Sequence, residues 1–178
     1  MKCLLVIDMQ KISFSPLTPR YNADLVCANI NRLSAHFRKN NDPMIFIQHN
    51  GINQNICIPG SAEWEILDEL DMHESDVIVE KKHNDSFCKS GLEQTLKSLD
   101  VTELFITGCA TDFCVNSTLQ TAFAKGYKCT VVADGHTTAD RPGIAAGDAI
   151  DYFHYIWNDM YPVNGKIEIK TADSIIST

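Results

Sequence analysis

Five short segments of this chain are apolar almost throughout, and they alternate with stretches that have helical spacing. The segments lie at residues 3–7, 44–49, 76–80, 103–108 and 129–133. Strands that are apolar on both sides are typical of a parallel sheet whose two faces are both covered. Alternation of strand and helix at this interval therefore predicts an α/β fold, a doubly wound sandwich with helices on both faces.

The helical spacing is clearest at residues 23–39, where Leu25, Ile30, Leu33 and Phe37 form one apolar stripe. Further helices are predicted at 90–100, at 113–126 with Gly126 as its end, and at about 142–160. Residues 50–74 are rich in turn formers and predict a loop with a short helix near the active face.

Composition limits the kind of protein this is. A chain of 178 residues with 44% hydrophobic and 21% charged residues predicts one globular domain over residues 1–178. No apolar run approaches the roughly 20 residues of a membrane span. A net charge of −8, with no basic run beyond "EKK", argues against nucleic acid and anionic membranes as partners. Seven cysteines without a CxxC pair favour a reducing, cytoplasmic location.

Reactive side chains follow the ends of the predicted strands. Ligands of doubly wound folds bind outside the carboxyl ends of the strands, so residues at this edge are the first candidates for a site. The candidates are Asp8, His49–Asn50, Lys81–Lys82–His83, Cys109–Cys114 and Asp134–His136. A carboxylate, an amine, a thiol and several imidazoles are therefore expected at one edge of the sheet.

Cys114 is the candidate nucleophile. If Thr111 or Asp112 caps a helix that begins near residue 113, Cys114 lies in its first turn, where the helix dipole favours the thiolate. Asp8 is placed to accept the thiol proton or to hold a cation, and Lys81 to pair with both. Each residue also has a structural alternative: a buried inert thiol for Cys114, a turn cap for Asp8 and a solvated lysine for Lys81.

The sequence offers little for a metal or a cofactor. His49, His83 and His136 have none of the close spacings of metal ligands, so no metal site is predicted. His136 is expected to form hydrogen bonds in a loop at a strand end. No glycine-rich phosphate loop follows the first strand, so no nucleotide cofactor and no flavin carrier is predicted.

Six blocks of sequence together resemble the isochorismatase-like cysteine hydrolases over most of the chain. They are "LLVIDMQ" at 4–10, "IQHNG" at 47–51, "PGSAEWEI" at 59–66, "VIVEKKHNDSF" at 77–87, "ITGCATDFCVNST" at 106–118 and "VVADGHTT" at 131–138. The resemblance implies a three-layer sandwich whose mostly parallel sheet has about six strands. It also implies an Asp–Lys–Cys triad of Asp8, Lys81 and Cys114. Lys81 is preferred to Lys82 because the family's aromatic residue six positions on matches Phe87.

The same resemblance implies a cis peptide bond between Cys109 and Ala110. The N–H groups of Ala110 and Cys114 would then form an oxyanion hole. Metal-dependent nicotinamidases of this superfamily carry an Asp-x-His pair and a further histidine that "IQHNG" and the residues after it lack. Some relatives that cleave vinyl ethers lack the cysteine, so its retention favours acyl chemistry.

These observations predict a cytoplasmic amidohydrolase that cleaves a C–N bond of a small amide, carbamoyl or ureido compound. Phe14, His49 and Trp64 are expected to line the pocket, although the aromatic residues could equally belong to the core or to a subunit interface. The alternatives are vinyl ether hydrolysis and a non-catalytic binding protein that has kept the fold. The resemblance also implies a homodimer or homotetramer, with the pocket bordered by a neighbouring subunit.

Overall fold

The computed structural model describes residues 1–161 and 163–177, and its centre is one parallel β-sheet. Six strands lie in the order β3-β2-β1-β4-β5-β6, and each neighbouring pair is parallel. The strands are β1 (Lys2–Ile7), β2 (Met44–His49), β3 (Val77–Lys81), β4 (Glu103–Cys109), β5 (Lys128–Thr137) and β6 (Glu168–Lys170). The predicted α/β sandwich is confirmed.

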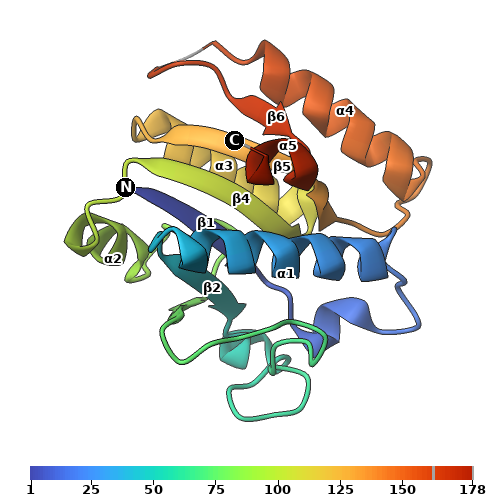
Figure 1. Ribbon diagram of the computed structural model, residues 1–178. Coiled ribbons are helices and arrows are strands. Elements are labelled where there is room, and N and C mark those ends of the chain that lie inside the picture. The colour runs from blue at the N-terminus through green and yellow to red at the C-terminus, as the bar shows by residue number, and fades with distance from the viewer. Residues whose placement is uncertain (162, 178) are drawn as a thin grey trace.

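Helices cover both faces of the sheet (Figure 1). They are α1 (Ala23–Lys39), α2 (Leu92–Ser98), α3 (Asn116–Ala124), α4 (Ala146–Asp159) and α5 (Ala172–Ile176). Buried residues of α1 and α5 share one hydrophobic cluster, and those of α2, α3 and α4 share the other. Within the described residues, no helix combines the length and the apolarity that crossing a bilayer requires.

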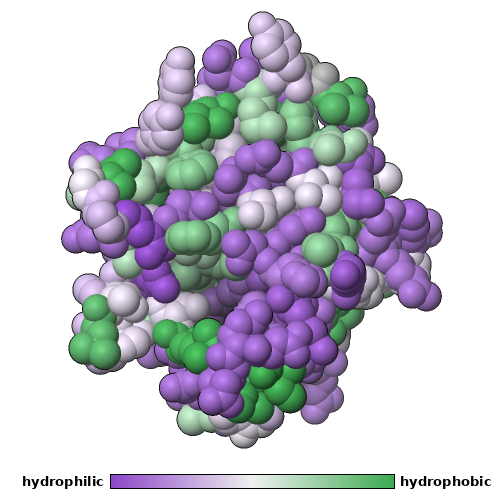
Figure 2. Space-filling view, turned by 180° about the vertical axis from the view of Figure 1, so that it is seen from behind, coloured by the Kyte–Doolittle hydropathy of each residue, from purple (hydrophilic) through white to green (hydrophobic). Residues whose placement is uncertain are grey.

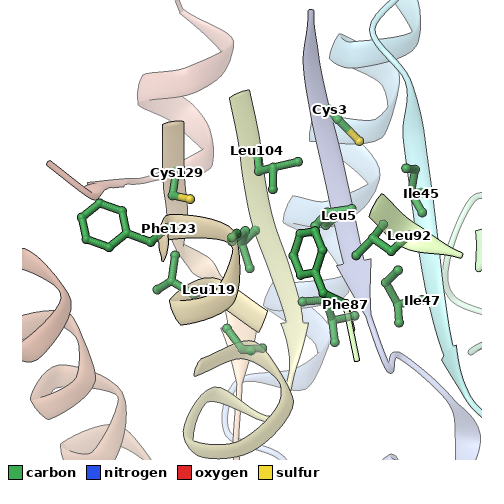
Figure 3. Close-up of a cluster of buried hydrophobic side chains, with 14 of the residues drawn as sticks. Cys3, Leu5, Ile45, Ile47, Phe87, Leu92, Leu104, Leu119, Phe123 and Cys129 are labelled. Carbon is green, nitrogen blue, oxygen red and sulfur yellow. The ribbon is translucent and has the colours of Figure 1, made fainter. Parts of the chain in front are cut away.

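The central strand explains why the sequence shows no polar–apolar alternation. Cys3, Leu5 and Ile7 belong to the cluster under α2 and α3 (Figure 3), whereas Leu4 and Val6 belong to the cluster under α1. Successive side chains of a strand point to opposite faces, so a strand that is covered twice must be apolar at every position. Burying one leucine side chain completely stabilises the folded state by roughly 1.5–3 kcal/mol.

The structure departs from the sequence prediction at the C-terminal edge of the sheet and in the connection between β2 and β3. The strand β6 and the short helix α5 were not among the segments predicted at residue level. β6 has three residues with charges on both sides of Ile169, so it carries no apolar run. Residues 50–74 contain a single 3₁₀ turn, Ile52–Gln54, among loops and bends.

The order of the strands creates a crevice beside β1. β1 lies between β2 and β4, so the chain winds in opposite directions on its two sides, and this is where doubly wound folds bind ligands. The backbones of β1 and β4 approach closely here: a Cβ on Gly108 would lie 2.1 Å from the carbonyl oxygen of Ile7. Only glycine fits, and its φ of +115° is also a conformation that favours glycine.

Candidate active site

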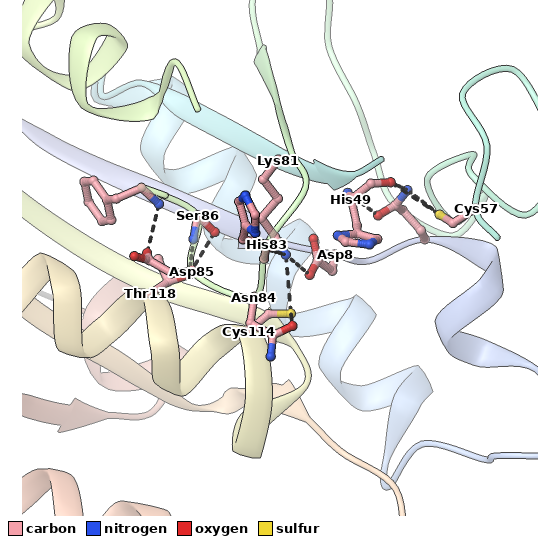
Figure 4. A network of polar contacts seen from close by, with 12 residues as sticks. Asp8, His49, Cys57, Lys81, His83, Asn84, Asp85, Ser86, Cys114 and Thr118 are labelled. Carbon is pink, nitrogen blue, oxygen red and sulfur yellow. Dashed lines mark hydrogen bonds and ion pairs between the residues drawn. The ribbon is translucent and has the colours of Figure 1, made fainter. Parts of the chain in front are cut away.

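Three strand ends bring Asp8, Lys81 and Cys114 together. Asp8 directly follows β1, Lys81 is the last residue of β3, and Cys114 lies in a π-helical turn, Thr111–Val115, after β4. The Lys81 Nζ atom lies 2.6 Å from Asp8 Oδ2 and 3.3 Å from Cys114 Sγ (Figure 4). A carboxylate, an ammonium and a sulfur atom from distant parts of the sequence are therefore in direct contact.

Lys81 is fully enclosed, and each of its three N–H bonds has a partner. Besides Asp8 and Cys114, its Nζ donates to the carbonyl oxygen of His83 at 3.0 Å. Burial disfavours the ammonium, but the Asp8 carboxylate and the Cys114 sulfur together outweigh it and raise the pKa of Lys81 above its ordinary value. The neighbouring Lys82 is exposed, so of the two lysines only Lys81 reaches the site.

The two carboxylate oxygens of Asp8 have different surroundings. Its backbone adopts the left-handed region at φ 49°, which turns the chain out of β1. Oδ2 accepts from Lys81, whereas Oδ1 is buried and has no hydrogen-bond partner among the described residues. Buried polar atoms are nearly always paired, so an unpaired carboxylate oxygen marks a place where another group is accommodated.

Cys114 differs from the sequence prediction in two ways. Neither Thr111 nor Asp112 caps the helix, because Thr111 contacts His136 and Asp112 binds Thr138 and Arg141. The pKa of Cys114 is also raised, where a lowered one was expected. Burial raises that pKa, the negative charge of Asp8 adds to the effect, and Lys81 opposes it only partly. The resting sulfur is therefore a thiol.

The backbone beside Cys114 has the isomer that the resemblance implies. The peptide bond between Cys109 and Ala110 is cis. Ala110 and Cys114 both line the same cavity, so their main chain borders the space next to the sulfur.

Behind this turn, Thr111 Oγ1 lies 2.8 Å from His136 Nδ1, and His136 Nε2 lies 2.8 Å from His154 Nε2. His136 was expected in a loop. It belongs instead to the buried end of β5, because that strand continues to Thr137.

A cavity of about 350 Å³ is lined by Asp8 and Cys114. His49 lines it, and its ring points toward Asp8 (Figure 4). Burial and the positive charge of Lys81 lower the pKa of His49, so its imidazole is neutral near pH 7, and its buried Nδ1 has no partner among the described residues. The other two expected pocket residues are not among the described residues that line this cavity, although the Trp64 carbonyl accepts from the lining Gln10 Nε2 at 2.8 Å. Phe14 packs against the α1 side of the core.

Sequence reasoning missed several polar residues of this cavity, among them Gln10, Arg20 and Arg141. Gln10 joins the ends of β1 and β2, because its Oε1 accepts from the His49 N–H at 2.7 Å and its Nε2 donates to the His49 carbonyl at 3.1 Å. It stands in the quoted "LLVIDMQ", two residues after Asp8, so the motif itself carried the signal. The two arginines lie in loops, where no pattern of spacing marks them.

No metal site is evident in this region. Within residues 1–161 and 163–177, no three His, Cys, Asp or Glu side chains are arranged to hold a metal ion together.

Comparison with known proteins identifies the family. A model of the isochorismatase domain matches residues 2–147 of the chain. The chain belongs to the isochorismatase family of hydrolases. A solved isochorismatase family protein superposes on this family member with a TM-score of 0.88 and 28% sequence identity, covering 96% of this chain and 98% of the other.

Several curated relatives of this isochorismatase-family chain are named for hydrolytic activities. It is 29% identical over 150 residues to the streptothricin hydrolase of Streptomyces noursei, covering 84% of the chain and 54% of that protein. It is 28% identical to Nicotinamidase 3 of Arabidopsis thaliana, covering 76% of the chain and 72% of the relative. It is 31% identical over 101 residues to the ureidoacrylate amidohydrolase of Methylobacterium radiotolerans, covering 57% and 39%. The chain thus spans about half the length of the first of these relatives.

Proposed function

We propose that this protein is a cysteine amidohydrolase that cleaves a C–N bond of a small amide, carbamoyl or ureido compound through a thioester. The observation that carries the proposal is the contact of Lys81 with both Asp8 and the Cys114 sulfur at the edge of a cavity. The names of two of the relatives support it, because a nicotinamidase and an amidohydrolase both cleave C–N bonds. A cavity of about 350 Å³ suits a small substrate.

The first half of the reaction forms the thioester. Because Cys114 rests as a thiol, it needs a base, and the unpaired Oδ1 of Asp8 is the available acceptor. As the proton moves to Asp8, the sulfur attacks the substrate carbonyl carbon and a C–S bond forms. The Lys81 ammonium stabilises the negative charge that develops on sulfur. The N–H groups of Ala110 and Cys114 hold the oxyanion.

The second half releases the products. The oxyanion collapses, the C–N bond breaks, and the leaving nitrogen takes the proton from Asp8. Water then attacks the thioester carbonyl and gives a proton to Asp8. The C–S bond breaks, the acid product leaves, and the sulfur recovers its proton from Asp8. The balance is one water consumed and one amide bond hydrolysed.

His49 is proposed as a substrate-binding residue. Its neutral ring lines the cavity and its Nδ1 has no partner among the described residues, so it can form a hydrogen bond with the substrate. Burial disfavours a charged imidazolium here and the nearby Lys81 ammonium adds to the effect, so the lowered pKa of His49 favours the neutral form.

The test is a screen for ammonia release over a panel of amides, carbamoyl compounds and ureas. On a substrate so found, Cys114→Ala should lower kcat by more than about 10³-fold, whereas Cys88→Ala, the other partly exposed thiol, should leave kcat unchanged. Wild-type rates in Cys114→Ala would refute the thioester. Hydrolysis of a vinyl ether that survives Cys114→Ala but not Asp8→Asn would assign the chain to ether chemistry instead. No turnover of any compound, together with tight capture of a partner, would favour a binding protein.

We also propose that copies of this chain associate. Ile52, Ile56 and Ile58 are exposed in the connection between β2 and β3, and Ile56 lines the cavity. Hydrophobic residues gather at the lower end of the face in Figure 2, where this connection lies. Light scattering coupled to size exclusion should give a multiple of the 19.9 kDa monomer mass. A mass of one chain at micromolar concentration would refute this expectation.

A further inference from the structure

One positive charge at the cavity has no counter-ion among residues 1–161 and 163–177. Three charged residues line it: Asp8, Arg20 and Arg141. Asp8 is neutralised by Lys81 at 2.6 Å. Arg141 is neutralised by Asp112, with Nε 2.7 Å from Oδ2 and Nη2 3.2 Å from Oδ1. Arg20 remains, because it forms no ion pair with any residue that the structure describes.

Arg20 is held at the cavity wall with part of its guanidinium unused. Its Nε donates to the carbonyl oxygen of Ser13, whereas its Nη1 is buried and has no hydrogen-bond partner among the described residues. The next residue anchors this loop to β5, since the Tyr21 N–H donates to the carbonyl of Thr138 at 2.9 Å and the Tyr21 carbonyl accepts from Thr137 at 2.6 Å. The guanidinium is therefore preorganised before any ligand arrives.

The position of Arg20 relates it to the reacting groups. Arg20 and Arg141 line the same cavity as Cys109 and Ala110, the two residues that the cis peptide bond joins. The walls of the same cavity include the apolar residues Ile12, Ile56 and Phe113. A ligand in this cavity thus has the nucleophile, an unpaired guanidinium and hydrocarbon among its neighbours.

We propose that Arg20 binds a carboxylate of the substrate, so that the substrates of this enzyme are small acids that also carry the scissile amide, carbamoyl or ureido group. This inference rests on the proposed function, because it assigns the remainder of the molecule that Cys114 attacks. A monoanion matches the single uncompensated charge, whereas a phosphate dianion would leave a negative excess beside Asp8. The local positive charge also offsets the repulsion that a net charge of −8 exerts on an acidic substrate.

Binding and turnover together test the proposal. Cys114→Ala protein is titrated by calorimetry with ureidoacetate, 3-ureidopropionate and 4-ureidobutyrate, each paired with the alkylurea that lacks the carboxylate. We expect at least one acid to bind more than tenfold more tightly than its partner. Adding Arg20→Gln should weaken that acid by about 10- to 150-fold and leave the alkylurea within twofold. Arg20→Lys should recover part of the affinity, because lysine restores the positive charge but not the planar guanidinium that can bind a carboxylate through two N–H groups.

Arg32→Gln is the matched control, since Arg32 is a surface arginine paired with Asp173, and it should change neither affinity. Equal binding of every acid and its alkylurea would overturn the proposal, as would an equal loss for both in Arg20→Gln, which would show a purely structural role. The proposed function fails separately. If Cys114→Ala leaves turnover intact while the Arg20-dependent preference for acids persists, the thioester is refuted and the role of Arg20 stands.

Discussion

Replacing Asp8 by asparagine should make Cys114 more reactive toward an alkylating agent and make the enzyme nearly inactive. The negative charge of Asp8 helps to raise the pKa of Cys114, whereas Lys81 lowers it. Without the carboxylate, the ammonium faces the sulfur alone and favours the thiolate. At the same time the group that we propose as acceptor of the thiol proton is lost. If Cys114 had only a structural role, Asp8→Asn would not combine faster alkylation of Cys114 with a loss of activity.

The size of the effect follows from the geometry. Contacts of 2.6 Å from Asp8 Oδ2 to Lys81 Nζ and 3.3 Å from Nζ to Cys114 Sγ place the carboxylate oxygen and the sulfur within about 6 Å of each other. At an effective dielectric constant of about 20, two charges at that distance interact by about 3 kcal/mol, which changes the thiolate fraction about 100-fold. A less basic thiolate is a weaker nucleophile, so alkylation should accelerate by about tenfold.

The assay is iodoacetamide alkylation at pH 7, followed at the Cys114 peptide by mass spectrometry. Cys88 in the same sample provides an internal reference, and Glu80→Gln is the control because Glu80 is exposed and directly precedes Lys81. Asp8→Asn should lower kcat by about 10²- to 10⁴-fold. Alkylation of Cys114 that is unchanged or slower in Asp8→Asn would refute the reasoning, because the carboxylate would then not suppress the thiolate.

Three further results are expected. Lys81→Met should cost about 3–5 kcal/mol in urea unfolding, and combining it with Asp8→Asn should cost less than the sum of the two; additive costs would mean that the pair is uncoupled. Burial lowers the pKa of His136 from 6.5 to about 3, so the unfolded chain binds the extra proton between these pH values and the free energy of unfolding falls by about 1.4 kcal/mol per unit as pH drops. His136→Gln should flatten that slope; identical slopes in the variant and the unmodified protein would contradict this. Leu5→Ala in the central strand should cost about 2–5 kcal/mol, and a loss below about 1 kcal/mol would contradict its full burial.

Much of the sheet could be predicted because its central strands are buried on both sides. The apolar runs of β1 and β2 reflect two covering layers, and strand order then places their carboxyl ends together. β6 could not be predicted in this way, because its charged residues flank a single isoleucine at the edge of the sheet. The π-helical turn before α3 was also missed, since the bonds of Thr111 and Asp112 to residues of the β5 region depend on contacts distant in sequence.

The candidate site was predictable in its residues and less so in its electrostatics. Asp8, Lys81 and Cys114 follow from strand ends and from the resemblance, and the structure places them in contact. The thiol form of Cys114 was not predicted, because a helix end seen in sequence says nothing about how deeply the sulfur lies or how near a carboxylate stands. Arg20 was missed for a related reason: its importance comes from an unused N–H bond, which only the packed loop reveals.

Because Gly108 has no side chain, the geometry of the site is insensitive to many substitutions in the core. Its main chain rests directly on that of Ile7, with no atoms between that could be trimmed or enlarged. Asp8, the proposed proton acceptor, is one residue beyond Ile7, and Ala110, whose amide is proposed to hold the oxyanion, is two residues beyond Gly108. The distance between Asp8 and Ala110 is therefore set by direct backbone packing of β1 against β4. Changes of side-chain size elsewhere in the interior should leave this distance unchanged.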